Sequence, residues 1–151
     1  MIAAYHAGYI LDASVAVKWF AEREEADRDR AMALRARHAA GHIRLSVPMS
    51  FPLEVANALR LSHRFAEADI VAALQALEDL RLEVQPIGFD LLRKTVAIAF
   101  GYQVTVYDAV YVALAESVGF PLLTADDALR KKMKGHSIVL RLRDLAMRER
   151  R

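Results

Sequence analysis

Short apolar runs alternate with longer stretches of helical periodicity along this chain. Five runs that are nearly all apolar predict buried strands at 9–12, 43–47, 82–86, 121–124 and 137–140. The stretches between them predict helices at 15–20, 22–40, 50–63, 67–80, 89–100 and 105–118, with a further short helix from 125. Gly41, Gly101 and Gly119 stand where three of these helices are expected to end.

This alternation of strands and helices is typical of α/β proteins. Strands that are apolar on both faces predict a mostly parallel sheet covered by helices on each side. The sequence contains no internal repeat, low-complexity stretch or linker, so we expect residues 1–151 to form a single domain.

Composition excludes several classes of protein and of site. The chain has 151 residues, 55% of them hydrophobic and 26% charged, which is typical of a globular domain. It has no cysteine, so a disulfide scaffold, a thiolate zinc site and a cysteine nucleophile are excluded. No apolar stretch reaches the roughly 18 residues of a membrane span, and no secretory signal precedes the first strand. We therefore expect a cytoplasmic protein that does not use a membrane.

A few acidic residues lie where the surrounding sequence predicts burial. Asp12, Glu54 and Asp108 are each flanked by apolar residues, and Asp126 and Asp127 follow the apolar run at 121–124. Burying an isolated carboxylate costs several kcal/mol unless another group compensates. These acids therefore call for an explanation that solvated helix faces do not need.

The predicted positions of these acids bring most of them to one edge of the sheet. Asp12 and Asp126 follow strands directly, and Glu54 lies early in a helix that leaves another strand. Ligands of open parallel sheets bind at this edge. Asp108 begins a helix with no strand before it, and its face of that helix points toward the interior.

Helix capping is the alternative explanation for single acids. Asp12 is placed to cap the short helix that follows it, and Thr105-x-x-Asp108 and Thr124-x-x-Asp127 both match the capping-box pattern. Ser50 is expected to cap the helix at 50–63.

Glu54 lies beyond the capping positions, on a face shared with Asn57, Ala58 and Leu61, which we interpret as apolar and interior. Several acids in apolar sequence near one edge are more simply explained as one cluster. Clustered carboxylates raise one another's pKa, and a bound divalent cation relieves that repulsion.

The donor atoms indicate the kind of cation. All the candidates offer carboxylate oxygens, which suit Mg²⁺ or Mn²⁺ better than Zn²⁺. The histidines show no spacing typical of metal ligands; they are His6, His38, His42, His63 and His136. Magnesium held by a few carboxylates usually acts on phosphate groups.

Four segments of the sequence resemble the PIN-domain ribonucleases, most closely the VapC toxins of type II toxin–antitoxin systems. They are YILDASVAVKW with Asp12 and Ser14, VPMSFPLEVANALR with Glu54 and Asn57, VTVYDAVYVALAE with Asp108, and LLTADDAL with Thr124 and Asp126. The four motifs occur in the family's order and span residues 9 to about 130.

The resemblance implies a fold, an activity and a set of site residues. It implies a three-layer α/β/α sandwich with a mostly parallel sheet of four to five strands. It also implies an endoribonuclease that depends on Mg²⁺ or Mn²⁺ and carries the acidic quartet Asp12, Glu54, Asp108 and Asp126. The expected supporting residues are Ser14, Asn57 and Thr124, which would orient ligands or bind phosphate, with capping as the alternative.

The resemblance also implies partners. These are an RNA substrate and a VapB-like antitoxin, and we also expect a second copy of the chain. The alternatives are a PIN-domain nuclease of RNA processing or decay without an antitoxin, and a non-catalytic PIN-fold binding module.

Several residues have two interpretations from the sequence. The candidates for contact with RNA phosphates are also compatible with solvated helix faces; they are Arg60, His63, Arg64, Arg130, Lys131, Lys132 and Lys134. Trp19 is compatible with base stacking, although we favour a place in the core. A core position is favoured over a groove or dimer face for most of a second set, Val55, Leu59, Phe65, Ile70 and Leu74.

The net charge of +2 is lower than is usual for nucleic-acid-binding domains. Setting the acidic quartet aside leaves 15 acidic residues against 21 basic ones, a net of +6. The sequence thus predicts a moderately basic surface around an acidic pocket.

Overall fold

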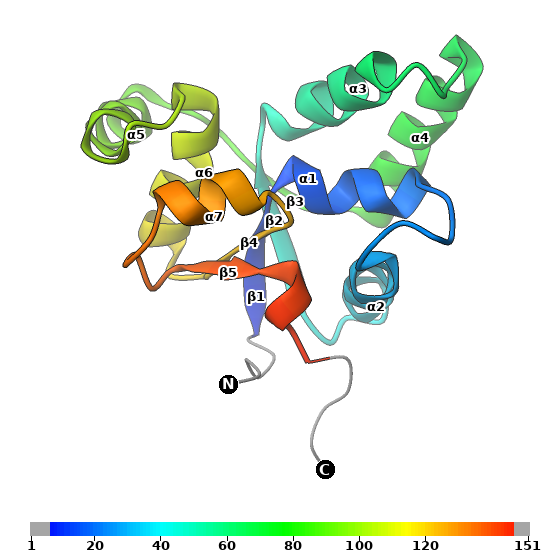
Figure 1. Ribbon diagram of the computed structural model, residues 1–151, viewed down its shortest axis with the longest axis horizontal. Helices are drawn as coiled ribbons and strands as arrows, with labels where there is room; N and C mark the ends of the chain where they lie inside the picture. Colours follow the sequence, from blue (N-terminus) through cyan, green and yellow to red (C-terminus); the bar gives the residue numbers. More distant parts are fainter. Residues whose placement is uncertain (1–6, 147–151) are drawn as a thin grey trace.

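Five short strands, all parallel, form the centre of the computed structural model of the chain, which describes residues 7–146 (Figure 1). The strands are β1 Gly8–Leu11, β2 Arg44–Pro48, β3 Glu83–Gln85, β4 Leu122–Thr124 and β5 Val139–Arg141. Their order across the sheet is β3-β2-β1-β4-β5. All five predicted strands are present, and the expectation of a parallel sheet is confirmed.

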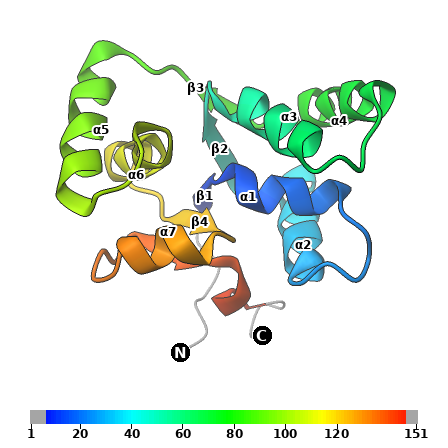
Figure 2. The ribbon, with the colours of Figure 1, turned by 45° about the horizontal axis from the view of Figure 1, so that its top comes forward.

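Helices cover both faces of this sheet. They are α1 Ala13–Ala16, α2 Arg28–Ala39, α3 Phe51–Leu61, α4 Glu67–Leu80, α5 Phe89–Tyr102, α6 Val106–Val118 and α7 Asp127–Lys132, with 3₁₀ turns η1 Val17–Phe20 and η2 Leu142–Asp144. Figures 1 and 2 show α1 to α4 on one side and α5 to α7 on the other. Right-handed crossovers produce this division, because the chain crosses the sheet in opposite directions before and after β3. The three-layer α/β/α sandwich is confirmed.

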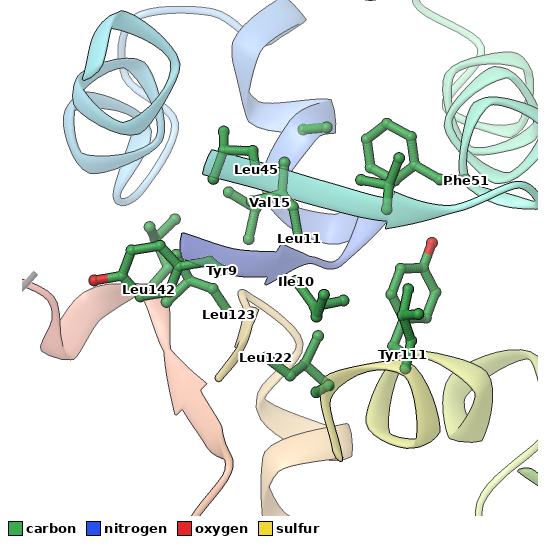
Figure 3. Close-up of a cluster of buried hydrophobic side chains, with 14 of the residues drawn as sticks. Tyr9, Ile10, Leu11, Val15, Leu45, Phe51, Tyr111, Leu122, Leu123 and Leu142 are labelled. Carbon is green, nitrogen blue, oxygen red and sulfur yellow. The ribbon is translucent and has the colours of Figure 1, made fainter. Parts of the chain in front are cut away.

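Strands β1 and β4 are buried throughout because side chains pack on both faces of the sheet there. Figure 3 shows Leu11 on the side of Val15 and Leu45, whereas Ile10 lies on the side of Leu122 and Tyr111. All six of these residues are 0–1% exposed. Covered strands of this kind need no alternation of polar and apolar residues, which explains the apolar runs in the sequence.

The segment 22–27 is not helical, so the prediction of a helix over 22–40 is wrong at its start. Lys18 Nζ donates to the backbone oxygen of Ala26 at 2.7 Å and to Glu25 Oε1 at 3.0 Å. Asp27 then adopts a left-handed conformation (φ 59°), and α2 begins at Arg28. These two bonds from Lys18, which reach seven and eight residues along the chain, thus hold the turn that delays the helix.

Two other predicted helix ends differ from the structure. Gly101 does not end α5, which continues to Tyr102 and stops at Gln103 in a left-handed conformation (φ 54°). Ser50 occupies the N-cap position of α3, but its hydroxyl makes no capping bond and is buried without a partner in the described residues. Gly119 ends α6 with φ 81°, as predicted.

The direction of strand addition reverses between β1 and β4. The chain proceeds from β1 to β2 and β3 on one side of this point, and from β4 to β5 on the other. Such a switch point opens a crevice at the carboxyl ends of the two strands. Asp12 follows β1 and Asp126 follows β4, so both acids lie at this crevice.

Within residues 7–146, no single helix is long and apolar enough to span a membrane. Helices α5 and α6 reach that length and apolarity only as a pair, and they are bent by 115° at the break between them.

Gly8, at the start of β1, has no room for a larger side chain. The ring of Phe120 covers Gly8 so closely that a Cβ atom would overlap its carbons. The Arg44 guanidinium stacks on the same ring, 5.4 Å from its centroid. The missing side chain therefore lets Phe120 close the amino-terminal end of the sheet.

We predict that Gly8→Ala lowers the free energy of unfolding by about 1 kcal/mol, because the Phe120 ring has to move. Gly101→Ala is the control, since a Cβ there meets no atom within 4 Å. The control should gain about 0.5–1 kcal/mol from its helical position. Urea denaturation measures both, and equal effects of the two substitutions would contradict the role of Phe120.

Candidate active site

The loops that follow β1 and β4 are joined by a hydrogen-bonded network around Asp12. This aspartate is only 6% exposed. Ser14 Oγ donates to Asp12 Oδ2 at 2.6 Å, and Thr124 Oγ1 donates to the same oxygen at 2.8 Å. The backbone N–H of Ala125 in turn donates to Ser14 Oγ at 3.0 Å. Asp12 occupies the N-cap position of α1 but makes no capping bond, so the capping alternative is wrong for its side chain.

Asp126 continues the network on the β4 side. Its backbone N–H donates to Thr124 Oγ1 at 3.0 Å, and its own Oδ1 accepts from the Leu129 N–H at 3.0 Å. Asp126 therefore caps α7, and the predicted capping box of Thr124 and Asp127 is wrong. The Thr124 hydroxyl is engaged by Asp12 instead, while the Asp127 carboxylate accepts a bond of 2.9 Å from Arg143.

Glu54 reaches the crevice from the first turns of α3. The buried side of this helix is formed by Phe51, Val55 and Leu59, and Glu54 lies half-buried beside it. The Tyr111 hydroxyl donates a short hydrogen bond to Glu54 Oε2. The interpretation of Glu54 as part of an interior apolar face is wrong, because the other members of that face are exposed; they are Asn57, Ala58 and Leu61.

Asp108 enters from the first turn of α6. Its backbone N–H donates to Thr105 Oγ1 at 3.1 Å, so the predicted cap by Thr105 is present. Its side chain is half-buried, and the face it shares with Tyr111, Val112 and Ala115 is buried, as the periodicity predicts.

Burial dominates the electrostatics of Asp12. Removal from water raises the pKa of Asp12 to about 6, and the bonds from Ser14 and Thr124 offset only part of this effect. The negative charges of Asp108 and Asp126 make a smaller contribution to this raised value. The two hydrogen bonds thus hold the Asp12 carboxyl in place, but its ionisation still costs free energy.

The pKa values of Glu54 and Asp108 are also raised by their surroundings. Burial raises the pKa of Glu54 to about 7 despite the Tyr111 bond, and the charges of Asp12 and Asp108 add to the shift. Burial also raises the pKa of Asp108, with a further contribution from Asp126, whereas Thr105 and Lys132 lower it. Four acids from four separate segments therefore act on one another at the crevice.

Most of the predicted site residues meet at the crevice. They are Asp12, Ser14, Glu54, Asp108, Thr124 and Asp126. Asn57 does not join them by any hydrogen bond within residues 7–146; it is exposed and lines a groove between α3 and α4. His38 Nε2 donates to the Leu80 carbonyl oxygen and His136 binds Glu116, both outside the network. His6 lies outside the described residues.

The sequence profile described as "PIN domain" matches residues 9–134. The chain belongs to the PIN-domain family. The match includes all four segments that carry the acids and ends after α7.

Curated relatives of this PIN domain are named as VapC ribonucleases. Ribonuclease VapC3 of Pyrobaculum aerophilum is 51% identical over 43 residues, which are 28% of this chain and 33% of that protein. Ribonuclease VapC1 of Mycobacterium tuberculosis is 39% identical over 87 residues, 56% of this chain and 64% of that protein. The chain thus matches between a third and just under two thirds of the length of these relatives.

Solved structures share the fold over most of their length. PAE2754 from Pyrobaculum aerophilum has a TM-score of 0.66 and 23% identity, covering 93% of this PIN domain and 87% of that chain. A toxin–antitoxin complex from Klebsiella pneumoniae gives 0.61 and 17% identity, covering 94% and 99%. VapBC-5 from Mycobacterium tuberculosis gives 0.58 and 21%, covering 90% and 98%.

The donor set at the crevice fits the divalent cation that PIN nucleases generally use. All four acids offer oxygen atoms, the ligands preferred by Mg²⁺ and Mn²⁺. In residues 7–146, no three acidic or histidine side chains form a ready-made cage for a metal. Magnesium usually keeps several of its waters and binds only one or two carboxylates directly, so an open cluster is compatible with it.

Tyr111 is the residue of this site that sequence reasoning did not select. It lies one turn after Asp108, 1% exposed, and its hydroxyl is the partner of Glu54. The D-x-x-Y spacing placed it on the Asp108 face, but only the approach of α3 to α6 shows what its hydroxyl binds.

We predict that the metal-free protein loses stability as the pH rises from about 4 through about 6. A carboxyl whose pKa is raised by folding binds its proton more tightly in the folded state, so the stabilisation is present at low pH and lost above the folded pKa. Urea denaturation in EDTA should show wild type losing about 1 kcal/mol more than Asp12→Asn between pH 5 and pH 8. Parallel pH profiles of the two proteins would contradict the raised pKa of Asp12.

We predict that Tyr111→Phe raises the pKa of Glu54 above its value of about 7, because the carboxylate loses the donor that favours its charged form. An NMR titration of the side-chain carboxyl carbons in EDTA measures this change. Tyr102→Phe is the matched control, since it also removes one hydroxyl but Tyr102 lies against His136. An unchanged Glu54 pKa in Tyr111→Phe would refute the positioning role of Tyr111.

Proposed function

We propose that this PIN domain is an endoribonuclease that hydrolyses RNA phosphodiester bonds with the help of Mg²⁺ or Mn²⁺. The observation that carries the proposal is the meeting of Asp12, Glu54, Asp108 and Asp126 at the switch point of the sheet. Burial and the neighbouring negative charges there raise the pKa of the first three. The VapC ribonucleases that resemble the chain support the choice of RNA as substrate.

Each residue of the cluster has a proposed part. Asp12, Asp108 and Glu54 would hold the cation, directly or through waters, and Asp126 would complete the site. Ser14 and Thr124 keep Asp12 Oδ2 in place, which leaves its Oδ1 for a ligand. When bound, the cation would supply a water of lowered pKa and positive charge beside the scissile phosphate.

Glu54 is suited to hold or move a proton during hydrolysis. Its pKa of about 7 means that both protonation states are populated near neutral pH in the metal-free protein. Tyr111 occupies Oε2, and Oε1 has no hydrogen-bond partner among residues 7–146. Oε1 is therefore the atom we assign to proton exchange with a water or with the leaving oxygen.

We further propose that the nuclease is the toxin of a type II toxin–antitoxin pair with a VapB-like antitoxin. The names of its relatives and the toxin–antitoxin complexes among its structural neighbours support this role. The expected homodimer and cytoplasmic location belong to the same proposal. Apolar side chains left exposed on α3 and α5, such as Leu53 and Phe100, support contact with other chains.

We predict that Asp12→Asn slows Mg²⁺-dependent RNA cleavage at least about 100-fold, because several kcal/mol of charge stabilisation depend on the cation it helps to hold. Purified protein is incubated with total cellular RNA with Mg²⁺ or EDTA, and the new RNA ends are mapped. Asp79→Asn, which removes an exposed acid on α4, is the matched control and should cleave as wild type does.

Unchanged cleavage by Asp12→Asn would refute the assignment of the site. A wild type that neither cleaves RNA nor binds Mg²⁺ would favour a non-catalytic binding module. Expression of the wild type in a host distinguishes a toxin from an RNA-processing nuclease. Growth arrest that a cognate antitoxin relieves supports the toxin. RNA cleavage without growth arrest favours the RNA-processing nuclease.

A further inference from the structure

A basic hollow of about 400 Å³ lies between α7 and the end of the sheet at β5. We call it the α7 hollow. It is lined by Asp127, Arg130, Lys131, Lys134, Arg141 and Arg143. Five of these six side chains are cationic, and none of them is apolar or aromatic.

Two segments of the chain, separate in sequence, form this hollow. Asp127, Arg130, Lys131 and Lys134 follow the spacing of one helical face along α7 and the turn after it. The segment of β5 and η2 contributes the two remaining arginines across from that face. The charged run that sequence reasoning singled out in α7 is thus only half of the surface.

Only part of this positive charge is neutralised within the protein. Arg143 pairs with Asp127 at 2.9 Å, and Arg141 pairs with Asp144 at 2.7 Å. Among residues 7–146, the other three cations of the hollow have no ion-pair partner; they are Arg130, Lys131 and Lys134. Like charges held this close repel one another, so the hollow is stabilised by binding an anion.

The hollow and the acid cluster lie at the same edge of the sheet. Arg141 is paired in register with Thr124, the residue whose hydroxyl binds Asp12, and adjacent strands are about 5 Å apart. Asp127 in the hollow directly follows Asp126 in the cluster. Lys132, on the adjoining face of α7, is near enough to lower the pKa of Asp108. Helix α7 therefore carries one cation near the acids, Lys132, and the cations that line the hollow.

The other cations that the sequence offered for phosphate contact lie in different surroundings. Arg60 lines the groove between α3 and α4 together with Leu53, Ile70 and Val71. Arg64 lines a second groove, whose lining combines apolar residues such as Phe20 and Leu59 with the two acids Glu22 and Glu25. Apolar side chains in the first groove, and apolar and acidic side chains in the second, suit a phosphate backbone less well than the basic α7 hollow does, so the structure separates the two sets of candidates.

We propose that the α7 hollow binds the phosphodiester backbone of the RNA strand whose scissile bond lies at the acid cluster. The inference rests on the proposed nuclease function and adds the surface that holds the substrate. A hollow with five cations, three of them without an acidic partner among residues 7–146, and without apolar anchors is suited to follow a nucleic-acid backbone without reading its bases. An acidic protein segment would instead be expected to use apolar or aromatic contacts at the centre of its interface, which this lining lacks.

The test measures RNA binding without cleavage. A fluorescein-labelled single-stranded RNA of about 20 nucleotides is titrated with wild type or with the double variant Lys131→Gln, Lys134→Gln in EDTA, over a range of salt concentrations. Each lost phosphate contact reduces the slope of log affinity against log salt by about 0.7 for a single strand. The double variant should therefore bind more weakly, with a slope reduced by about 1.4.

Two control variants make the result specific to the hollow. The variant Arg93→Gln, Lys94→Gln removes two exposed cations from α5 and should keep the wild-type slope. The variant Lys131→Arg, Lys134→Arg keeps the charge and should also keep it. Thermal unfolding of each protein confirms that the variants are folded.

The outcomes separate this inference from the proposed function. Weaker binding with a reduced slope only in the Gln pair at α7 supports the hollow, whether or not the wild type cleaves RNA with Mg²⁺. An unchanged slope in that variant overturns the hollow, even if the wild type cleaves RNA. Binding of a polyglutamate peptide at the hollow, with no change in RNA affinity, also overturns it in favour of an acidic protein partner.

Discussion

The site of this protein depends on the burial of one carboxylate, Asp12, between two hydroxyl donors. Ser14 comes from the start of α1 and Thr124 from the end of β4, and both donate to the same oxygen of Asp12. The two hydroxyls also receive backbone N–H groups from the loop after β4. One buried acid therefore joins two segments more than 100 residues apart in the sequence, and the position of Asp126 and the start of α7 follow from this junction.

This arrangement keeps the carboxylates close together at a cost in free energy that the folded protein has to bear. Burial and mutual repulsion raise the pKa of Asp12 to about 6 and that of Glu54 to about 7, so ionising these two carboxyls costs more in the metal-free cluster than in water. A bound divalent cation would offset this cost. The repulsion that opposes folding of the metal-free protein would then contribute to cation affinity under the proposed function, and shifted pKa values of this kind are typical of functional sites.

Charge is distributed unevenly over this small domain. The net charge of +2 conceals acids gathered at the switch point and cations gathered beside them in the α7 hollow. The two sets are neighbours because Arg141 lies in register with Thr124 at the end of the sheet. An acidic pocket bordered by a basic surface has the polarity that the proposed metal-dependent action on a phosphate backbone requires.

The sequence by itself determined the α/β class and the five parallel strands, because buried strands require apolar runs. It also singled out the four acids that the structure brings to the crevice, because an acid within or next to an apolar run is conspicuous. It predicted helix ends less well: Lys18 holds the segment 22–27 out of α2, and Asp12 takes the Thr124 hydroxyl that would otherwise have been free to cap α7. Only the tertiary structure decided the hydrogen-bond partners of the site residues, such as the Tyr111 hydroxyl that donates to Glu54. It also decided that Arg141 and Arg143 line the same hollow as the cations of α7. Local spacing determines which face a residue occupies, whereas its partner across the fold depends on how distant segments pack.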